Sequence, residues 1–212
     1  MGTKDLNGYI NRLLQPYSRE RSWAHCYKAF YAAHEQKLES DEMIDMLSLH
    51  LCVYLSSWGM YRGSSFLLRS MDYKVHSNVV KLLLDTKYEK LWNLCDAVNG
   101  DLLWELSEKI RRHYEMCRDL IEDNGTATDT LVTKILLGTM ACIPAYDTQV
   151  CNSLRKWGYS AKYSRRSLSE MVAFYEKNRP EIDNWHTALQ DAEGIDNYPL
   201  MKAIDTYLWY NT

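Results

Sequence analysis

Apolar side chains recur every three or four residues along most of this chain, and that spacing restricts the fold to helices. Trp23, Tyr27, Phe30 and His34, for example, fall on one face of a single helix. No convincing run of alternating apolar and polar residues marks a strand. We therefore expect an all-α fold, a compact multi-helix bundle of about 9–11 helices.

Capping residues and helix breakers set the expected helix ends. Ser40 is placed to cap a helix whose first turn carries two acids, residues 167–170 match a capping box, and Pro180 and Pro199 can each start a helix. The helix at 41–61 is apolar almost all round, which predicts that it is the central buried one. The main expected helices cover residues 23–38, 41–61, 78–98 with a break near 85, 102–122, 129–142, 148–157, 167–178, 180–192 and 199–209.

The length of 212 residues allows one large domain or two small ones. We expect a single helical domain over 1–212, with a division into lobes 1–122 and 123–212 around a cleft as the alternative. The chain has 16 Tyr and 7 Trp against 3 Phe, and aromatic side chains with a polar group suit half-buried positions and interfaces.

Cysteine usage and hydropathy indicate a cytoplasmic protein. The six cysteines form no C-x-x-C pair, which favours free thiols in a reducing compartment. The first residues carry no apolar signal core. The longest uncharged stretch, residues 46–61, is too short and too polar to span a bilayer, so no membrane association is expected.

Several common catalytic and cofactor patterns are absent from the sequence. It contains no H-E-x-x-H or E-x-x-H pair, no phosphate-binding loop, no dinucleotide-binding turn and no nucleophile elbow. His113 and Cys117 share a helix face, but two residues do not make a metal site. We therefore expect neither a metal nor a cofactor.

The most distinctive segment joins an apolar run to a carboxylate. Twelve uncharged residues separate Lys134 from Asp147, and Pro144 produces a turn near the end of this run. We expect the run to be buried and Asp147 to lie at the start of the next helix. An Asp at that place either caps the helix by accepting backbone N–H bonds or acts as a catalytic group, and both interpretations stay open.

A second candidate site lies where the helix at 41–61 ends. Residues 55–65 combine Ser57, Tyr61 and Arg62 with small residues and two glycines, which permit close backbone approach. A partly buried Arg needs an anionic partner. Arg62 either pairs with an internal acid at a tight helix contact or lines a cleft where it meets a phosphate or carboxylate.

A basic segment at 155–166 is the third candidate. No acidic residue occurs from 148 to 169, cations can neutralise phosphates, and the interleaved aromatic rings can stack on bases. The net charge of −3 excludes a uniformly basic nucleic-acid binder but allows a local cationic face. The segment either binds DNA or is a solvated loop. Its candidate residues are Arg155, Lys156, Trp157, Arg165 and Arg166.

Three short stretches resemble the helix-hairpin-helix superfamily of DNA base-excision glycosylases, the endonuclease III-like members in particular. NGTAT at 124–128 lies where that family has its glycine hairpin, and YDTQV at 146–150 is similar to the segment that carries its catalytic Asp. LSS at 55–57 resembles the end of the helix that borders the base pocket. Asp129 stands where lyase-competent members have a nucleophilic lysine.

The resemblance implies a DNA-binding, monofunctional hydrolase that removes a flipped base, or a catalytically decayed relative that still binds DNA. Asp147 would stabilise the cationic sugar and orient water. Substrate binding would fall to Arg62, Ser57, Tyr61, Arg155, Lys156, Trp157, Arg165 and Arg166. Two alternatives stay open: a non-enzymatic helical interaction protein of bacterial or phage origin, and a small-ligand binding domain that uses Arg62.

Overall fold

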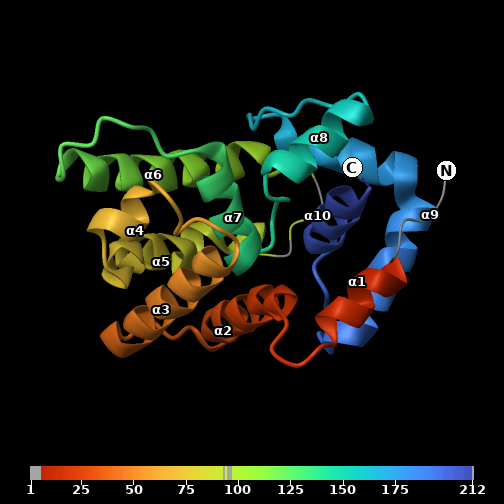
Figure 1. Ribbon diagram of the computed structural model, residues 1–212, viewed down its shortest axis with the longest axis horizontal. Coiled ribbons are helices and arrows are strands. Elements are labelled where there is room, and N and C mark those ends of the chain that lie inside the picture. Colours follow the sequence, from red (N-terminus) through yellow and green to blue (C-terminus); the bar gives the residue numbers. More distant parts are fainter. Residues whose placement is uncertain (1–5, 93, 95–96, 212) are drawn as a thin grey trace.

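The computed structural model describes residues 6–92, 94 and 97–211, and these residues form helices and no β-strand (Figure 1). Ten α-helices and three short 3-10 helices confirm the expected all-α fold for this part of the chain. The elements are α1 (Leu6–Leu13), η1 (Arg19–Arg21), α2 (Ser22–Gln36), α3 (Asp41–Ser57), α4 (Phe66–Ser70), η2 (Tyr73–His76), α5 (Ser77–Leu84), η3 (Thr86–Leu91), α6 (Gly100–Asp119), α7 (Asp129–Thr139), α8 (Thr148–Lys156), α9 (Ser167–Glu193) and α10 (Leu200–Tyr210).

Helix ends differ from the expected ones where the backbone leaves helical geometry. α3 stops at Ser57 because Gly59 adopts a φ of 79°, a left-handed conformation that ends the helix. The two helices expected at 167–178 and 180–192 form one element, α9, which is kinked at Asn178. Pro180 lacks an N–H, and its ring clashes with the preceding turn, which accounts for the kink.

Helix caps were predicted correctly at Ser40 and wrongly at 167–170. Ser40 Oγ accepts a hydrogen bond from the Met43 N–H at 3.3 Å, as its position before α3 predicts. α9 instead begins at Ser167 itself, with Arg166 in the N-cap position. The Ser167 hydroxyl accepts from the Ser164 N–H at 2.7 Å, so it forms no capping box with Glu170.

The central buried helix is α7 rather than α3. Every residue from 131 to 139 is buried, and so is the apolar run that continues to Tyr146. α3 leaves Met46, Leu49 and Val53 about half exposed on one face. The prediction for 41–61 rests on apolar residues on all sides of that helix. This pattern does not identify the most buried helix, because single apolar side chains are tolerated at the surface.

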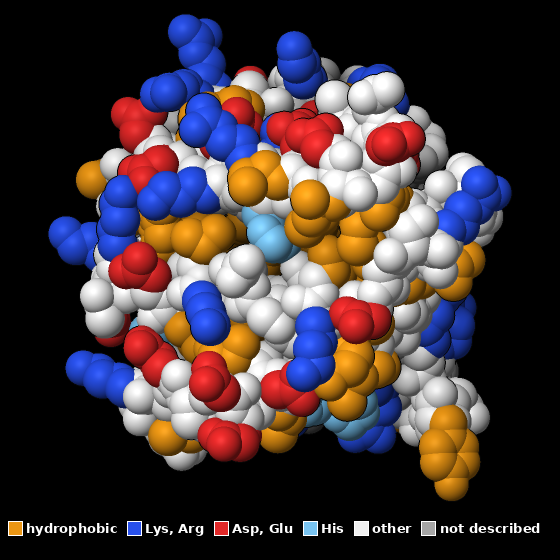
Figure 2. Space-filling model, turned by 90° about the vertical axis from the view of Figure 1, so that its left-hand side faces the viewer, with side chains coloured by type: hydrophobic (Ala, Val, Ile, Leu, Met, Phe, Trp, Pro, Cys, Tyr) orange, Lys and Arg blue, Asp and Glu red, His pale blue; other side chains and the backbone are white. Residues whose placement is uncertain are grey.

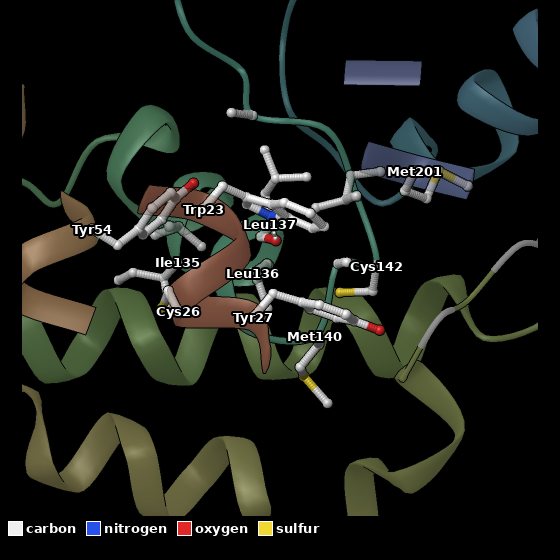
Figure 3. Close-up of a cluster of buried hydrophobic side chains, with 14 of the residues drawn as sticks. Trp23, Cys26, Tyr27, Tyr54, Ile135, Leu136, Leu137, Met140, Cys142 and Met201 are labelled. Carbon is white, nitrogen blue, oxygen red and sulfur yellow. Dashed lines mark hydrogen bonds between the residues drawn. The ribbon is translucent and has the colours of Figure 1, made fainter. Parts of the chain in front are cut away.

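Close packing of α2 and α3 around α7 builds the core (Figure 3). Trp23 Nε1 donates a hydrogen bond to the Leu137 carbonyl oxygen at 2.8 Å. The Tyr54 ring lies directly on Gly138, where an added Cβ would come within 2.2 Å of the ring. These two contacts hold the last turn of α7 between the neighbouring helices.

The helices fall into two groups in Figure 1, with α2 to α7 at the left and α1, α8, α9 and α10 at the right. α1 contacts α9, and α7 packs against α2, α3 and α6. Helices from the two sides of residue 122, the boundary of the alternative two-lobe division, therefore pack against each other.

Among the helices of the described residues, none combines the length and the hydropathy that a membrane span requires.

The face at the left-hand side of Figure 1 carries no uniform charge. Figure 2 shows basic and acidic side chains interspersed over it, with apolar patches between them. Interspersed charges of both signs create no strong local potential. This face therefore forms no continuous cationic surface.

Candidate functional site

A groove of about 500 Å³ forms where the end of α3, the first turns of α7, the start of α8 and the end of α10 meet η1. Arg62 and Asp147, two residues selected from the sequence, both line it. Ser57 lines it as well. The remaining lining residues are Arg19, Ser56, Trp58, Gly59, Met60, Thr130, Lys134, Thr148, Gln149 and Trp209.

Asp147 is the N-cap of α8, as one of the two interpretations predicted. Its Oδ1 accepts from the backbone N–H groups of Gln149 and Val150, both at 3.1 Å. Its Oδ2 accepts from Lys134 Nζ at 3.0 Å. The carboxylate is therefore fixed by three donors, and it also faces the groove. Capping is confirmed, and the catalytic interpretation stays a prediction.

Lys134 is a site residue that the sequence-based selection did not include. It is 5% exposed, and its Nζ lies 5.5 Å from the centre of the Trp58 ring as well as against Asp147. One signal could have identified it, since Lys134 is the only charged residue between Asp129 and Asp147. A lone charge inside a buried run must find a partner, because an unpaired buried ammonium is very costly.

Two indole rings form the aromatic wall of the groove. Trp58 and Trp209 meet edge to face, with ring centres 6.5 Å apart and an angle of 82° between their planes. Trp58 Nε1 donates to Ser22 Oγ at 3.0 Å, which fixes the ring. The Arg19 guanidinium lies over the same ring, 4.9 Å from its centre.

Arg62 lies at the outer rim and is exposed. Its side chain folds back over Gly59, where an added Cβ would lie 3.3 Å from Arg62 Nε. Among the described residues, no acidic side chain forms an ion pair with Arg62. The alternative in which Arg62 pairs with an internal acid is therefore not seen in the described part of the chain.

A small cavity of about 20 Å³ adjoins the groove and shares Trp58, Lys134, Asp147 and Trp209 with it. That volume suffices for about one water molecule. Four of the nine remaining lining residues are aromatic, and two others form a second buried ion pair described below. The aromatic side chains that complete the wall are Tyr9, Trp23, Tyr54 and Tyr210.

The second ion pair joins Lys202 and Asp205 of α10. Lys202 Nζ lies 3.0 Å from Asp205 Oδ2, and Asp205 Oδ1 accepts from the Ala145 N–H at 3.0 Å. Lys202 Nζ also lies 5.4 Å from the Trp23 ring centre. Sequence reasoning missed this pair, although its two residues are the only charged ones in the expected helix at 199–209.

Tyr61 does not line the groove, in contrast to its predicted role. Its hydroxyl is hydrogen-bonded to Nε2 of the buried His76 at 2.7 Å, and His76 Nδ1 is bonded to the Tyr114 hydroxyl at 2.6 Å. Burial lowers the pKa of His76 to about 3. The left-handed turn at Gly59 lies between Trp58 and Tyr61 in the sequence. Trp58 lines the groove, whereas Tyr61 does not.

The basic segment at 155–166 lies apart from the groove, and none of its residues lines it. Trp157 is half-buried against Phe174 and Tyr207, which removes most of its ring from solvent. Arg165 pairs with Asp101 at 2.9 Å, an exposed contact worth little. Arg155, Lys156 and Arg166 are exposed, so the segment remains a separate cationic surface.

The turn at 124–128 offers no free amide at its glycine. The Gly125 N–H donates to Asp123 Oδ1 at 3.1 Å, and the Arg118 side chain packs against Gly125. Thr128 then caps α7 by accepting from the Leu131 N–H at 3.2 Å. The amide that the family resemblance would give to a phosphate is thus already bonded to a carboxylate.

The described residues contain no group of three or more His, Cys, Asp or Glu side chains placed to share a metal ion. The candidate site is therefore the groove with its adjoining cavity. The groove is cationic and tryptophan-walled, and Asp147 is the one carboxylate among its lining residues. No protein-family model matches this sequence, and no curated protein or solved structure matches it at a significant level.

Proposed function

We propose that the protein binds DNA and holds one unpaired nucleotide in the groove. The observation that carries this proposal is the composition of the groove, which joins three cations, two indole rings and one carboxylate. Its volume of about 500 Å³ lies within the range of roughly 300–1,000 Å³ that small-ligand sites occupy. An anion that also carries a flat ring matches such a lining best.

Each part of a nucleotide has a matching group in the groove. Arg19 and Arg62 can bind phosphate oxygens, since guanidinium groups form charge-assisted hydrogen bonds with them. Trp58 and Trp209 offer rings for stacking, the main sequence-tolerant contribution in single-strand binding. Asp147 can accept a hydrogen bond from an amino group on the edge of a base.

Hydrolytic removal of the base is the second candidate, and it concerns the same groove. The Asp147 carboxylate lies at the groove and beside a cavity large enough for about one water. A fixed carboxylate can stabilise positive charge that develops on the sugar. The Lys134 ammonium, 3.0 Å away, offsets part of that negative charge, so binding is the primary proposal.

Salt-dependent binding of a fluorescent single-stranded oligonucleotide tests the primary proposal. We expect measurable binding at low salt, with affinity falling steeply as salt rises because phosphate contacts release counterions. Arg62→Ala should reduce the slope of log K against log salt by about 0.7, the contribution of one phosphate contact on a single strand. Arg69→Ala is the matched control, since Arg69 is exposed and lies outside the groove.

Absence of binding to single-stranded and duplex DNA at low salt would overturn the proposal and favour a protein-interaction role. Asp147→Asn tests the hydrolytic candidate separately. If Asp147 is catalytic, this variant, shown to be folded by its circular dichroism spectrum, still binds DNA because the Asn Oδ1 can accept the same hydrogen bond, but it releases no base from a substrate that the wild type cleaves. No base release by the wild type would remove the hydrolytic candidate and leave binding intact.

A further inference from the structure

We propose that Arg19 exchanges places with the ligand: a base that stacks on Trp58 displaces the Arg19 guanidinium, which then binds a phosphate of the same strand. This inference rests on the proposed DNA-binding function. It makes Arg19 a specificity-determining residue, because exchange favours a ligand that supplies a ring and an anion together. A ring without a phosphate has to displace the guanidinium without giving it a new partner.

The position of Arg19 is the first observation. Its guanidinium, a flat cation, lies 4.9 Å from the centre of the Trp58 ring. An aromatic base that stacks on an indole takes up the same kind of position. The guanidinium and the base therefore compete for one ring.

The second observation is that the ring is fixed while Arg19 is not. Trp58 is held by its hydrogen bond to Ser22 at 3.0 Å and by its edge-to-face contact with Trp209. Arg19 is exposed, and it forms no ion pair with the described acidic residues. Its contact with the ring is an exposed cation–π contact, which is weak enough for a ligand to replace.

Lys134 cannot take the same part, although its Nζ also lies 5.5 Å from the Trp58 ring centre. It is buried, and its ammonium is bound to Asp147 at 3.0 Å. Moving it would deprive the Asp147 carboxylate, whose side chain is only 16% exposed, of its ion-pair partner, at a cost in free energy. Arg19 is therefore the cation of this ring that can move toward a phosphate.

The destination of the displaced guanidinium lies in the same groove. Arg19 and Arg62 both line it, so we place the phosphate that receives the displaced guanidinium in the groove that both side chains already line. Two guanidinium groups around one phosphate neutralise more of its charge than one. Base stacking thus prepares the second phosphate contact.

The test compares two single-stranded probes of equal length, an oligothymidylate of eight nucleotides and its uncharged methylphosphonate analogue. In Arg19→Ala, the natural strand should bind more weakly at low salt, with the salt slope reduced by about 0.7. The uncharged strand should bind about two- to fivefold more tightly, the effect of removing a competing exposed cation–π contact. Arg21→Ala, from the same 3-10 helix, should change neither probe.

Arg19→Lys provides a second variant that keeps the charge. It should retain the salt slope of the wild type, because the ammonium still neutralises a phosphate. Weaker binding of both probes to Arg19→Ala, in a variant that melts like the wild type, would overturn the exchange and leave Arg19 as a simple contact. Failure of the wild type to bind the natural strand would instead overturn the proposed function.

Discussion

Lys134 Nζ lies 3.0 Å from Asp147 Oδ2, and the two side chains are only 6% and 16% exposed. The pair connects the second turn of α7 to the first turn of α8, across the buried connection that ends at Tyr146. It also belongs to both the groove and the adjoining cavity. One ion pair thus fixes the position of α8 and sets the charge at the edge of the site.

Lys134→Met should destabilise the protein strongly. Removing one partner of a buried ion pair leaves the other charge uncompensated, which costs about 3–5 kcal/mol. Urea unfolding monitored by circular dichroism measures the change in free energy of unfolding. Asp147→Asn, added to Lys134→Met, removes the orphaned charge and should restore part of the loss. A double variant that is no more stable than the sum of the two single losses predicts would contradict this coupling.

The pH dependence of stability should contain a contribution from Glu193. Burial raises the pKa of this half-buried carboxyl from 4.5 to about 7, with Lys202 and Tyr198 opposing the shift. The folded state therefore holds a proton that the unfolded state has lost between these two values. Stability then falls as pH rises from about 4.5 to about 7, by an amount on the order of 3 kcal/mol.

Glu193→Gln isolates this contribution, because Gln imitates the protonated carboxyl at every pH. The variant should match the wild type near pH 4.5 and become relatively more stable toward pH 8. Urea unfolding of both proteins across this range gives the difference, in which the other titrating groups cancel. A difference that stays constant with pH would show that Glu193 titrates as an ordinary carboxyl.

Gly138→Ala should destabilise the protein even though Ala favours helices. An added Cβ would lie 2.2 Å from the Tyr54 ring, and Tyr54 is itself buried in the core. Overpacking of this kind costs about 1–3 kcal/mol. Gly100→Ala is the matched control, since its Cβ would meet only one atom, at 3.5 Å. Equal melting temperatures for the two variants would mean that the Tyr54 ring moves aside freely.

Tyr61→Phe should lower stability without affecting DNA binding. The change leaves Nε2 of the buried His76 without its partner, which costs about 1–3 kcal/mol. Tyr73→Phe removes a comparable hydroxyl bond to Asp45, whose side chain is 45% exposed, so water can replace the lost group and the cost should be smaller. Weakened DNA binding by Tyr61→Phe would show that Tyr61 contacts the ligand after all.

The sequence predicted local features of the site well. The cap at Asp147 follows from a short-range rule, since an Asp directly before a helix accepts N–H bonds from its first turn. Burial of the apolar run follows from its lack of charge. Arg62 and Asp147 were each predicted from the short sequence segment around them, and in the structure both line one groove.

The remaining features depend on packing between distant segments, which local patterns do not specify. The aromatic wall joins Trp58 to Trp209, and the exposed cation over Trp58 comes from Arg19, near the other end of the chain. The capping box at 167–170 matched in residue type, but a loop amide at Ser164 took the serine hydroxyl. Trp157 has a ring that could stack on a base, but this ring packs against α9 and α10.

Photocross-linking tests the central claim, that an unpaired base lies in the groove, most directly. A single-stranded oligonucleotide with one 5-iodouracil is irradiated with the protein, because this base cross-links to an aromatic side chain on which it stacks. Peptide mapping should place the cross-link at Trp58 or Trp209, and Arg62→Ala should reduce its yield. Cross-links confined to the segment at 155–166, or none at a concentration where the strand is bound, would contradict the account.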